Sequence, residues 1–357
     1  MREKNIIIFV GELPSSIIHG VSLSNKINID ILSEKFKIIT IEEKSKISHH
    51  AMFHFSKVTK ILNNILQLIY IRIKYKYSKY LYMSLSISRF GLFKNIIISL
   101  LYKLLYRNSK IILHNYRGDF SIFYNKNIFN KILLHFINSF TYKIILLSDL
   151  MIDDEHQNLF FKKFVIIPNC VPYHTISKNL SISNQSMIYI SHFIESKGIY
   201  DLLEALVILE DRNVDFKINL FGQYANLEER KIISKYQSKN IIINDFIAEE
   251  DKLNQLSESS CLILPSHNEG QPQIILEAMS IGIPIIATNV GDIINMLGID
   301  YKYVVKKKSP TDLANTIQNF LESDNNEKIQ ISEYLKLRYK KYYSFDTHKI
   351  NLYNLFN

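Results

Sequence analysis

The sequence has 357 residues, 47% of them hydrophobic and 22% charged, and a formal net charge of +9. That composition excludes a disordered or fibrous chain, and that length predicts two domains of roughly 150 to 200 residues each. The two cysteines, Cys170 and Cys261, lie far apart without C-x-x-C spacing, which argues against a disulfide framework and favours a reducing cytoplasm.

The positive charge is concentrated in the first third of the chain. Residues 1–118 hold 19 Lys and Arg against 6 Asp and Glu, whereas residues 119–357 hold 24 against 28. No acidic residue occurs from Lys44 to Gly118, and basic residues interleave with tyrosines between Tyr70 and Tyr80. Such a surface attracts phosphate-rich partners, so an anionic membrane, nucleic acid and a merely solvated helix face are all candidate explanations. No apolar run reaches the roughly 18 residues of a spanning helix.

Strand and helix patterns alternate from the start of the chain. The apolar run Ile6–Val10 is typical of a strand buried on both faces, and a loop containing Gly20 follows it. A helix over 22–33 and a strand over 36–41 complete a β-loop-α-β unit, which predicts a parallel sheet. Further strands are expected at 80–85, 110–114, 143–147 and 165–169, with two helices within 56–107 and one over 123–140.

A polar segment over 177–186 has the composition of a linker, and a second alternating series follows it. Its strands are expected at 186–191, 216–221, 240–244, 261–265, 283–288 and 301–305, and a helical stretch covers 325–357. We therefore predict an α/β protein with domains over 1–172 and 173–335. A C-terminal helix over 336–357 is expected to pack back on the first domain.

The most informative segment runs from Leu264 to Ser280. A strand ends there near Pro265, a polar loop follows, and a helix begins near Pro272. The free amides of a helix N-terminus at the carboxyl end of a parallel strand favour a bound phosphate. Two acids in this segment, Glu269 and Glu277, would repel a phosphate, so we expect them to bind the hydroxyls of a sugar instead.

Glu269 and Glu277 enclose seven residues, and the helix continues into Gly282-Ile-Pro284. This E-x7-E pattern resembles glycosyltransferase family 4. Further matches to that family are Ser196-Lys197-Gly198, Leu220-Phe-Gly222 and Ile167-Pro-Asn-Cys-Val171. The resemblance covers most of residues 160–320 and is looser before residue 160, where it depends on Gly20, His114 and Leu147-Ser148.

The resemblance implies the GT-B fold, in which two Rossmann-like domains face a cleft and sugar transfer retains the anomeric configuration. It assigns Glu277 to the ribose hydroxyls, Glu269 to the donor sugar and Lys197 to the donor diphosphate. The amides of Gly270 and Gln271 would hold the sugar and phosphate. Gly20 would let the backbone of the first loop approach the diphosphate, and His114 would contact the transferred sugar from the first domain.

Two positions depart from the family pattern. Ser191-His192 stands where the family usually has Gly-Arg, and Gly270-Gln271-Pro272 stands where it has Gly-Phe-Gly. The family's phosphate-binding guanidinium is therefore missing, and His192 is a candidate for a weaker, pH-dependent contact in its place. Phe246 follows a predicted strand and is a candidate to stack on the nucleobase. No D-x-D motif occurs in a suitable loop, and we expect neither a cofactor nor a metal.

The sequence thus predicts a glycosyltransferase that uses a UDP- or GDP-linked sugar and a lipid-linked oligosaccharide acceptor in bacterial surface polysaccharide or O-antigen assembly. We expect it in the cytoplasm, on the inner face of the plasma membrane, without nucleic acid. Two alternatives stay open: a nucleotide-sugar epimerase or sugar phosphorylase on the same fold, and a non-catalytic membrane- or nucleic-acid-binding protein. The acid pair argues against the epimerase, and insensitivity to nucleotide sugars would indicate the non-catalytic protein.

Overall fold

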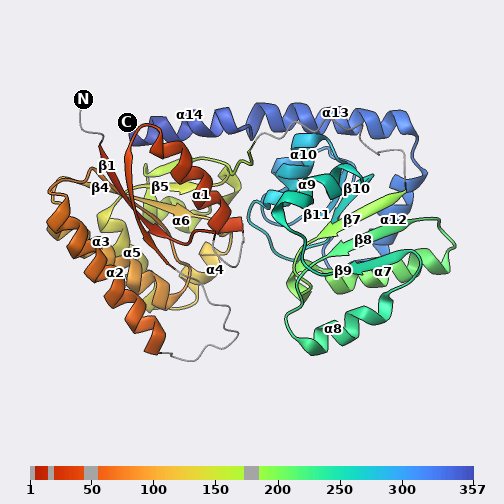
Figure 1. The fold of residues 1–357 in the computed structure, drawn as a ribbon, viewed down its shortest axis with the longest axis horizontal. Helices are drawn as coiled ribbons and strands as arrows, with labels where there is room; N and C mark the ends of the chain where they lie inside the picture. Colours follow the sequence, from red (N-terminus) through yellow and green to blue (C-terminus); the bar gives the residue numbers. More distant parts are fainter. Residues whose placement is uncertain (1–4, 15–19, 44–54, 173–184) are drawn as a thin grey trace. The chain divides into compact units, whose positions relative to one another are not determined.

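The computed structural model describes residues 5–14, 20–43, 55–172 and 185–357 (Figure 1). Contacts divide the chain into two compact units. Unit 1 is Met1–Asn169 together with Asp346–Asn357, and unit 2 is Cys170–Phe345. The last twelve residues therefore belong to the first unit, and the rest of the predicted C-terminal helix belongs to the second.

Unit 1 contains a parallel sheet in the order β2-β1-β3-β4-β5-β6. Its strands are β1 Ile6–Gly11, β2 Lys37–Glu42, β3 Tyr80–Ser84, β4 Lys110–Asn115, β5 Thr141–Leu146 and β6 Phe164–Ile166. Its helices are α1 Gly20–Ser33, α2 Phe55–Lys74, α3 Arg89–Leu105, α4 Phe120–Asn125, α5 Ile128–Phe140, α6 Asp154–Phe160 and α14 Phe345–Phe356, with a short 3-10 turn at Asp149–Met151.

Helices cover both faces of this sheet, and both faces carry apolar side chains. Ile8 and Leu81 belong to one buried cluster with side chains of α2, α3 and α5, and these helices pack side by side. Alternate residues point the other way, where Tyr80 and Tyr82 meet the ring of Phe356 on α14 at 5.2 and 5.5 Å between centroids. The continuous apolar strands read from the sequence therefore correspond to a sheet covered on both sides.

Helix α14 is fixed to unit 1 by a buried histidine as well as by Phe356. The Nδ1 atom of His348 lies 2.7 Å from the carbonyl oxygen of Pro168, and its Nε2 atom lies 2.6 Å from Oδ1 of Asn28. Burial lowers the pKa of His348 to about 4. The end of the chain is thus an integral part of the first unit.

Unit 2 contains a parallel sheet in the order β12-β11-β10-β7-β8-β9. Its strands are β7 Ser186–Ile190, β8 Lys217–Phe221, β9 Ile241–Asn244, β10 Cys261–Leu264, β11 Ile285–Thr288 and β12 Val304–Val305. Its helices are α7 Ile199–Asp211, α8 Leu227–Ile233, α9 Glu249–Ser257, α10 Gln273–Ile281, α11 Ile293–Leu297, α12 Pro310–Glu322 and α13 Asn325–Tyr342, with 3-10 turns at Glu195–Lys197 and Ser234–Tyr236. Helix α7 packs on α12 and α10 packs on α13, which gives a doubly wound layer structure (Figure 1).

Two predicted helices are each broken in the structure. The helix expected over 123–140 is two helices. The side chain of Asn127 accepts a hydrogen bond from the Asn130 amide and so caps the start of the second helix. The stretch expected over 325–357 breaks after Tyr342, where the chain passes from unit 2 to unit 1. The linker expected over 177–186 lies almost entirely outside the described residues.

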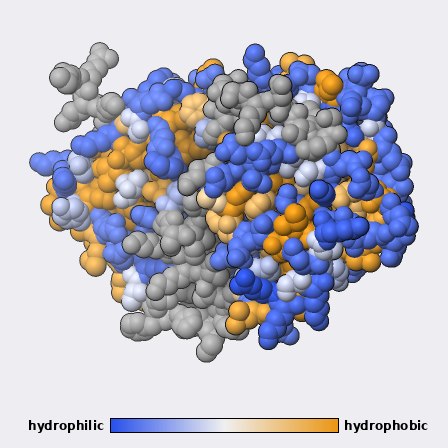
Figure 2. All heavy atoms as spheres, turned by 45° about the vertical axis from the view of Figure 1, so that its right-hand side comes forward, coloured by the Kyte–Doolittle hydropathy of each residue, from blue (hydrophilic) through white to orange (hydrophobic). Residues whose placement is uncertain are grey.

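Apolar side chains also reach the surface. Figure 2 shows orange patches between the hydrophilic side chains on the face that it draws. Within the described part of the chain, no helix is long and apolar enough to cross a bilayer.

Candidate functional site

The second sheet reverses its strand order between β7 and β10, which are hydrogen-bonded neighbours. Open parallel sheets bind ligands beyond the carboxyl ends of their strands at this kind of reversal. Lys197 follows β7, Glu269 follows β10, and Glu277 lies on the helix after it. The three residues predicted with most support therefore come from the segments that flank the reversal.

Lys197 and Glu269 form an ion pair, with 2.7 Å between Nζ and Oε1. Ser266 donates a second hydrogen bond to the same oxygen at 2.8 Å. The side chain of Lys197 is 26% exposed and that of Glu269 is 9% exposed. The ammonium is therefore open to a ligand from solvent, while the carboxylate that holds it is largely enclosed.

A glycine fixes the position of Lys197. Gly198 has a φ of +69°, and a Cβ atom there would lie 1.9 Å from the carbonyl oxygen of Pro265. The amide of His267 also donates to the carbonyl of Ser196 at 2.9 Å. The turn after β7 is thus packed directly against the end of β10, which only glycine permits at this position.

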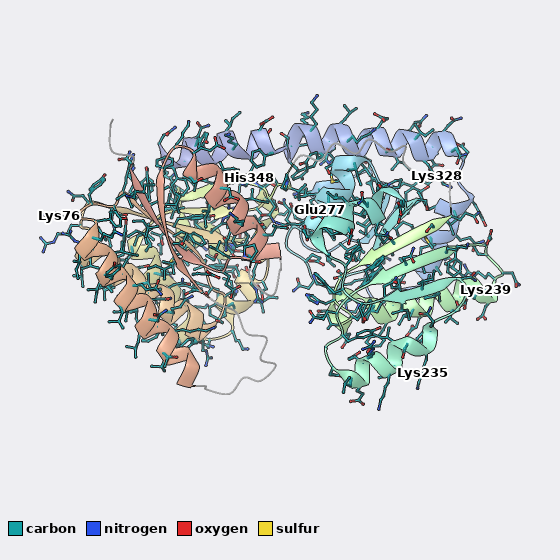
Figure 3. The ribbon with its side chains drawn as sticks, viewed as in Figure 1. Lys76, Lys235, Lys239, Glu277, Lys328 and His348 are labelled. Atoms are coloured by element: carbon teal, nitrogen blue, oxygen red, sulfur yellow. The ribbon has the colours of Figure 1, made fainter. Side chains whose placement is uncertain are left out.

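Glu277 lies on α10 and is only 3% exposed (Figure 3). Its Oε1 atom lies 2.7 Å from Nζ of Lys252 on α9. Its Oε2 atom is buried and has no hydrogen-bond partner among the described residues. A buried carboxylate oxygen without a partner is costly, so this side chain is well suited to accept a hydrogen bond from a ligand hydroxyl.

The charge on Glu277 depends on its neighbour. Burial raises the pKa of Glu277, and the ammonium of Lys252 opposes that rise. Burial by itself lowers the pKa of Lys252, but the carboxylates of Glu277 and Glu249 outweigh burial and hold it above its ordinary value. Because Lys252 also bonds Glu249 at 2.6 Å, we take the pair to be ionised at neutral pH.

The loop between β10 and α10 is held by the turn after β11. The amide of Asp292 donates to the carbonyl of Gly270 at 2.9 Å, and Nε2 of Gln271 donates to Oδ2 of Asp292 at 2.6 Å. Gly291 has a φ of +57°, and a Cβ there would lie 2.1 Å from the carbonyl of Glu269. Gly270 and Gln271 are therefore in a fixed backbone conformation before any ligand binds.

The contacts described above do not include His192, Phe246 or Gly20. His192 follows β7 and is partly buried, and its carbonyl oxygen accepts a hydrogen bond from Tyr189 at 3.0 Å. Phe246 is exposed after β9. In unit 1, Gly20 is the first residue of α1 and has open space around it, whereas the loop preceding it lies outside the described residues. Their roles toward a ligand stay predictions.

His114 is buried within unit 1. Its ring stacks on Tyr116 with 3.8 Å between centroids, and Nδ1 lies 2.8 Å from the hydroxyl of Tyr82. Burial lowers the pKa of His114 well below its ordinary value. Its Nε2 atom is without a hydrogen-bond partner in the described part of the structure. The predicted contact between His114 and a donor sugar therefore requires that this buried nitrogen become accessible.

Two residues of the site were not predicted from the sequence. Ser266 lies two residues after the strand that leads to Glu269, and its position in that loop was an available signal. Lys252 has no such signal, because it comes from α9 and no spacing relates it to Glu277. Within the described ranges no group of three His, Cys, Asp or Glu side chains is arranged to hold a metal, and metal independence stays a prediction.

The segment that contains this site is similar to a known protein family. Residues 176–338 match the family model described as glycosyl transferases group 1. This match includes Lys197, Glu269, Glu277 and Lys252, so it covers the whole cluster described above.

Relatives with curated names share similar segments. A Bacillus subtilis protein named for teichuronic acid biosynthesis, TuaC, is 26% identical over 141 residues, which are 40% of this chain and 34% of the relative. The capsular polysaccharide biosynthesis glycosyltransferase CapM of Staphylococcus aureus is 21% identical over 171 residues, 46% of this chain and 43% of the relative. The matches thus span less than half the length of these relatives.

Solved structures match nearly the whole chain. The sucrose-phosphate synthase of Thermosynechococcus elongatus has a TM-score of 0.75 at 13% identity and covers 99% of this chain and 98% of its own. Anabaena HepE, solved with UDP and glucose, has a TM-score of 0.72 at 14% identity and covers 98% of this chain and 99% of its own. At these identities the likeness shows the fold alone. The chain therefore has the GT-B fold, and its residues 176–338 are similar to the glycosyl transferases group 1.

Proposed function

We propose that this chain is a retaining glycosyltransferase that moves a sugar from a UDP- or GDP-linked donor to a lipid-linked saccharide. The reaction would serve bacterial surface polysaccharide synthesis at the inner face of the plasma membrane. The names of TuaC and CapM support the polysaccharide context, and HepE, crystallised with UDP-glucose in another structure, supports a nucleotide-sugar donor.

The observation that carries this proposal is the ion pair between Lys197 and Glu269 at the strand reversal. Its lysine is partly exposed, so an incoming diphosphate can replace the carboxylate as the partner of the ammonium. As the bond between the anomeric carbon and the diphosphate oxygen breaks, negative charge develops on the leaving group. A preplaced ammonium stabilises that charge, while the acceptor oxygen bonds the anomeric carbon and passes its proton to the departing diphosphate.

The two acids would then recognise hydroxyls. Lys252 occupies one oxygen of Glu277, and the other oxygen lies buried without a partner. We assign that oxygen to a ribose hydroxyl of the nucleotide. Glu269, once Lys197 turns toward the diphosphate, would accept hydrogen bonds from the donor sugar, with Ser266 keeping its carboxylate in place.

Calorimetric titration of the whole chain with UDP, GDP and ADP in EDTA tests the donor site. Lys197→Met and Glu277→Gln should each weaken binding of the preferred nucleotide roughly 10- to 100-fold, because each removes a hydrogen bond to a charged group. Lys239→Met is the matched control, since Lys239 is exposed at the surface of unit 2 (Figure 3). Wild-type affinity in both site variants would refute the assignment.

Product analysis separates the alternatives. A transferase releases free nucleoside diphosphate only with an acceptor present, whereas an epimerase keeps the bond between sugar and nucleotide. The anomeric configuration of the product, read by NMR, tests retention. A chain that binds none of the three nucleotides, with or without divalent metal, would favour a non-catalytic protein.

A further inference from the structure

The outer surface of helices α2, α3 and α5 is apolar although these helices already bury their inner faces on the sheet. They lie side by side over one face of the sheet in unit 1 (Figure 1). Each also exposes large apolar side chains at helical spacing. Six of these, between 48% and 76% exposed, are Leu66, Ile73, Leu104, Ile128, Ile132 and Phe136. Contiguous exposed apolar surface of this kind marks an interaction site in a folded protein.

The charges on the same helices have one sign. Helix α2 contains four basic residues, α3 contains three and α5 contains one, and none of the three helices contains an acid. Not all of these charges are free, because Lys94 is paired with Glu43. Lys74 at the end of α2 and Lys76 just after it are exposed.

Helix α5 also borders an open hollow of about 530 Å³. Ile128, Ile132 and Phe136 line it, together with polar side chains that include Lys131 and His135. An apolar hollow with a cation beside it suits a hydrocarbon chain that ends in an anionic group.

We propose that this surface, the outer face of α2, α3 and α5, is where the chain binds an anionic lipid membrane. A surface that combines exposed apolar side chains with Lys and Arg is the type that lies in the interface of a bilayer, with the apolar groups among the acyl chains and the cations at the headgroups. This inference rests on the proposed function, because the lipid-linked acceptor proposed above would lie in a membrane. Binding through this surface would place the chain on the membrane that carries the acceptor.

The charge and the apolar side chains of this surface each argue against one other occupant. A second copy of the chain docked through the same face would bring two uniformly basic surfaces together, which costs free energy. Nucleic acid suits the charge but not the apolar side chains, since interfaces with nucleic acid are polar as well as positive. Anionic lipid matches both properties.

Flotation of the whole chain with vesicles tests this proposal without any donor or acceptor. Neutral phosphatidylcholine vesicles are compared with vesicles that contain 30% phosphatidylglycerol, at low and high salt. We expect binding to the anionic vesicles, weakened by high salt because the exposed charges are screened. Lys74→Gln with Lys76→Gln should lower partitioning by about 25-fold at low salt, as two charges each contribute about fivefold.

Variants of the exposed apolar side chains test the apolar contribution to membrane binding. Ile73→Ser with Leu104→Ser should lower partitioning roughly tenfold or more at either salt. The control is Leu227→Ser with Lys235→Gln, which alters comparably exposed side chains of unit 2. UDP or GDP titration of every variant shows that the chain is folded and that the donor site, tested separately above, is intact.

Three results would overturn the proposal. The wild type does not bind anionic vesicles, it binds neutral vesicles equally well, or the control variant loses as much binding as the surface variants. Concentration-dependent dimerisation that the apolar variants abolish, without vesicle binding, would assign the surface to a second copy instead. If the serine variants do not fold, the lysine pair alone decides, because both lysines are exposed and their replacement leaves the buried side of α2 unchanged.

Discussion

Removal of Lys252 should destabilise unit 2 more than any loss of an exposed lysine. In Lys252→Met the buried carboxylate of Glu277 loses its ammonium partner at 2.7 Å, while the apolar part of the lysine is retained. Breaking a buried pair from one side costs about 3 to 5 kcal/mol. For a unit of this size, about 3 kcal/mol lowers the melting temperature by roughly 6 to 12 °C. Lys239→Met, which changes an exposed lysine, should leave the transition unchanged.

The loss should depend on pH in a defined direction. Burial already raises the pKa of Glu277 above the ordinary 4.5, and removal of Lys252 raises it further. Above about pH 4.5 the folded variant then holds a proton that the unfolded chain has released. Its unfolding free energy therefore falls as pH rises from 4.5 through the raised pKa, so the variant should be closer to wild type at pH 5 than at pH 8.

Urea unfolding of a double-mutant cycle measures this effect. Glu277→Gln removes the charge that Lys252→Met leaves unpaired, so the double variant should recover at least about 2 kcal/mol relative to the Lys252→Met chain. Additive losses in the cycle, or an Lys252→Met chain as stable as wild type at pH 8, would refute the argument that the two side chains form a buried ion pair.

Two further predictions concern backbone packing and the buried histidine. Gly198→Ala should destabilise the chain by about 1 to 3 kcal/mol in thermal melts, because its Cβ would meet the Pro265 carbonyl at 1.9 Å; Gly20→Ala, with open space around it, is the control and should be neutral. His348, with its pKa lowered to about 4 by burial, binds fewer protons folded than unfolded, so the stability it provides is lost as pH falls from about 6.5 to about 4. That loss amounts to about 3 kcal/mol. The free energy of unfolding of His348→Gln, measured in urea, should therefore fall less steeply than that of the wild type as pH is lowered from 6.5 to 4. An equally steep fall in both proteins would show that His348 is not the group responsible.

The sheets could be predicted from the sequence because each strand is a short apolar run between polar turns. Ile6–Val10 and 110–114 coincide with β1 and β4 to within a residue. Helix ends were harder to predict, because they depend on single side chains. Asn127 was within the predicted helix and instead starts a new one through its hydrogen bond to Asn130, although asparagine at a helix start is a recognisable signal.

In the candidate site too, some residues could be predicted from local motifs and others could not. Lys197 and Glu269 were found through motifs that surround each of them, and the structure pairs them directly. No local pattern could give Lys252 or the burial of His114. Lys252 reaches Glu277 from another helix, and His114 is enclosed by Tyr82 and Tyr116 through the packing of unit 1. Such contacts depend on how separate elements pack, which spacing along one chain does not record.

The two ion pairs of the site differ in the exposure of their lysines, and this difference suits them to different roles. Each joins a lysine to an acid of the predicted motif at 2.7 Å, so the four charges cancel before a donor arrives. The diphosphate of the proposed donor would carry its own negative charge and would need a cation that can change partners. Lys197 is the more exposed of the two lysines, at 26% against 13% for Lys252. Lys197 is therefore the cation that can turn to a ligand, whereas Lys252 keeps Glu277 ionised, with one oxygen ready for a hydroxyl.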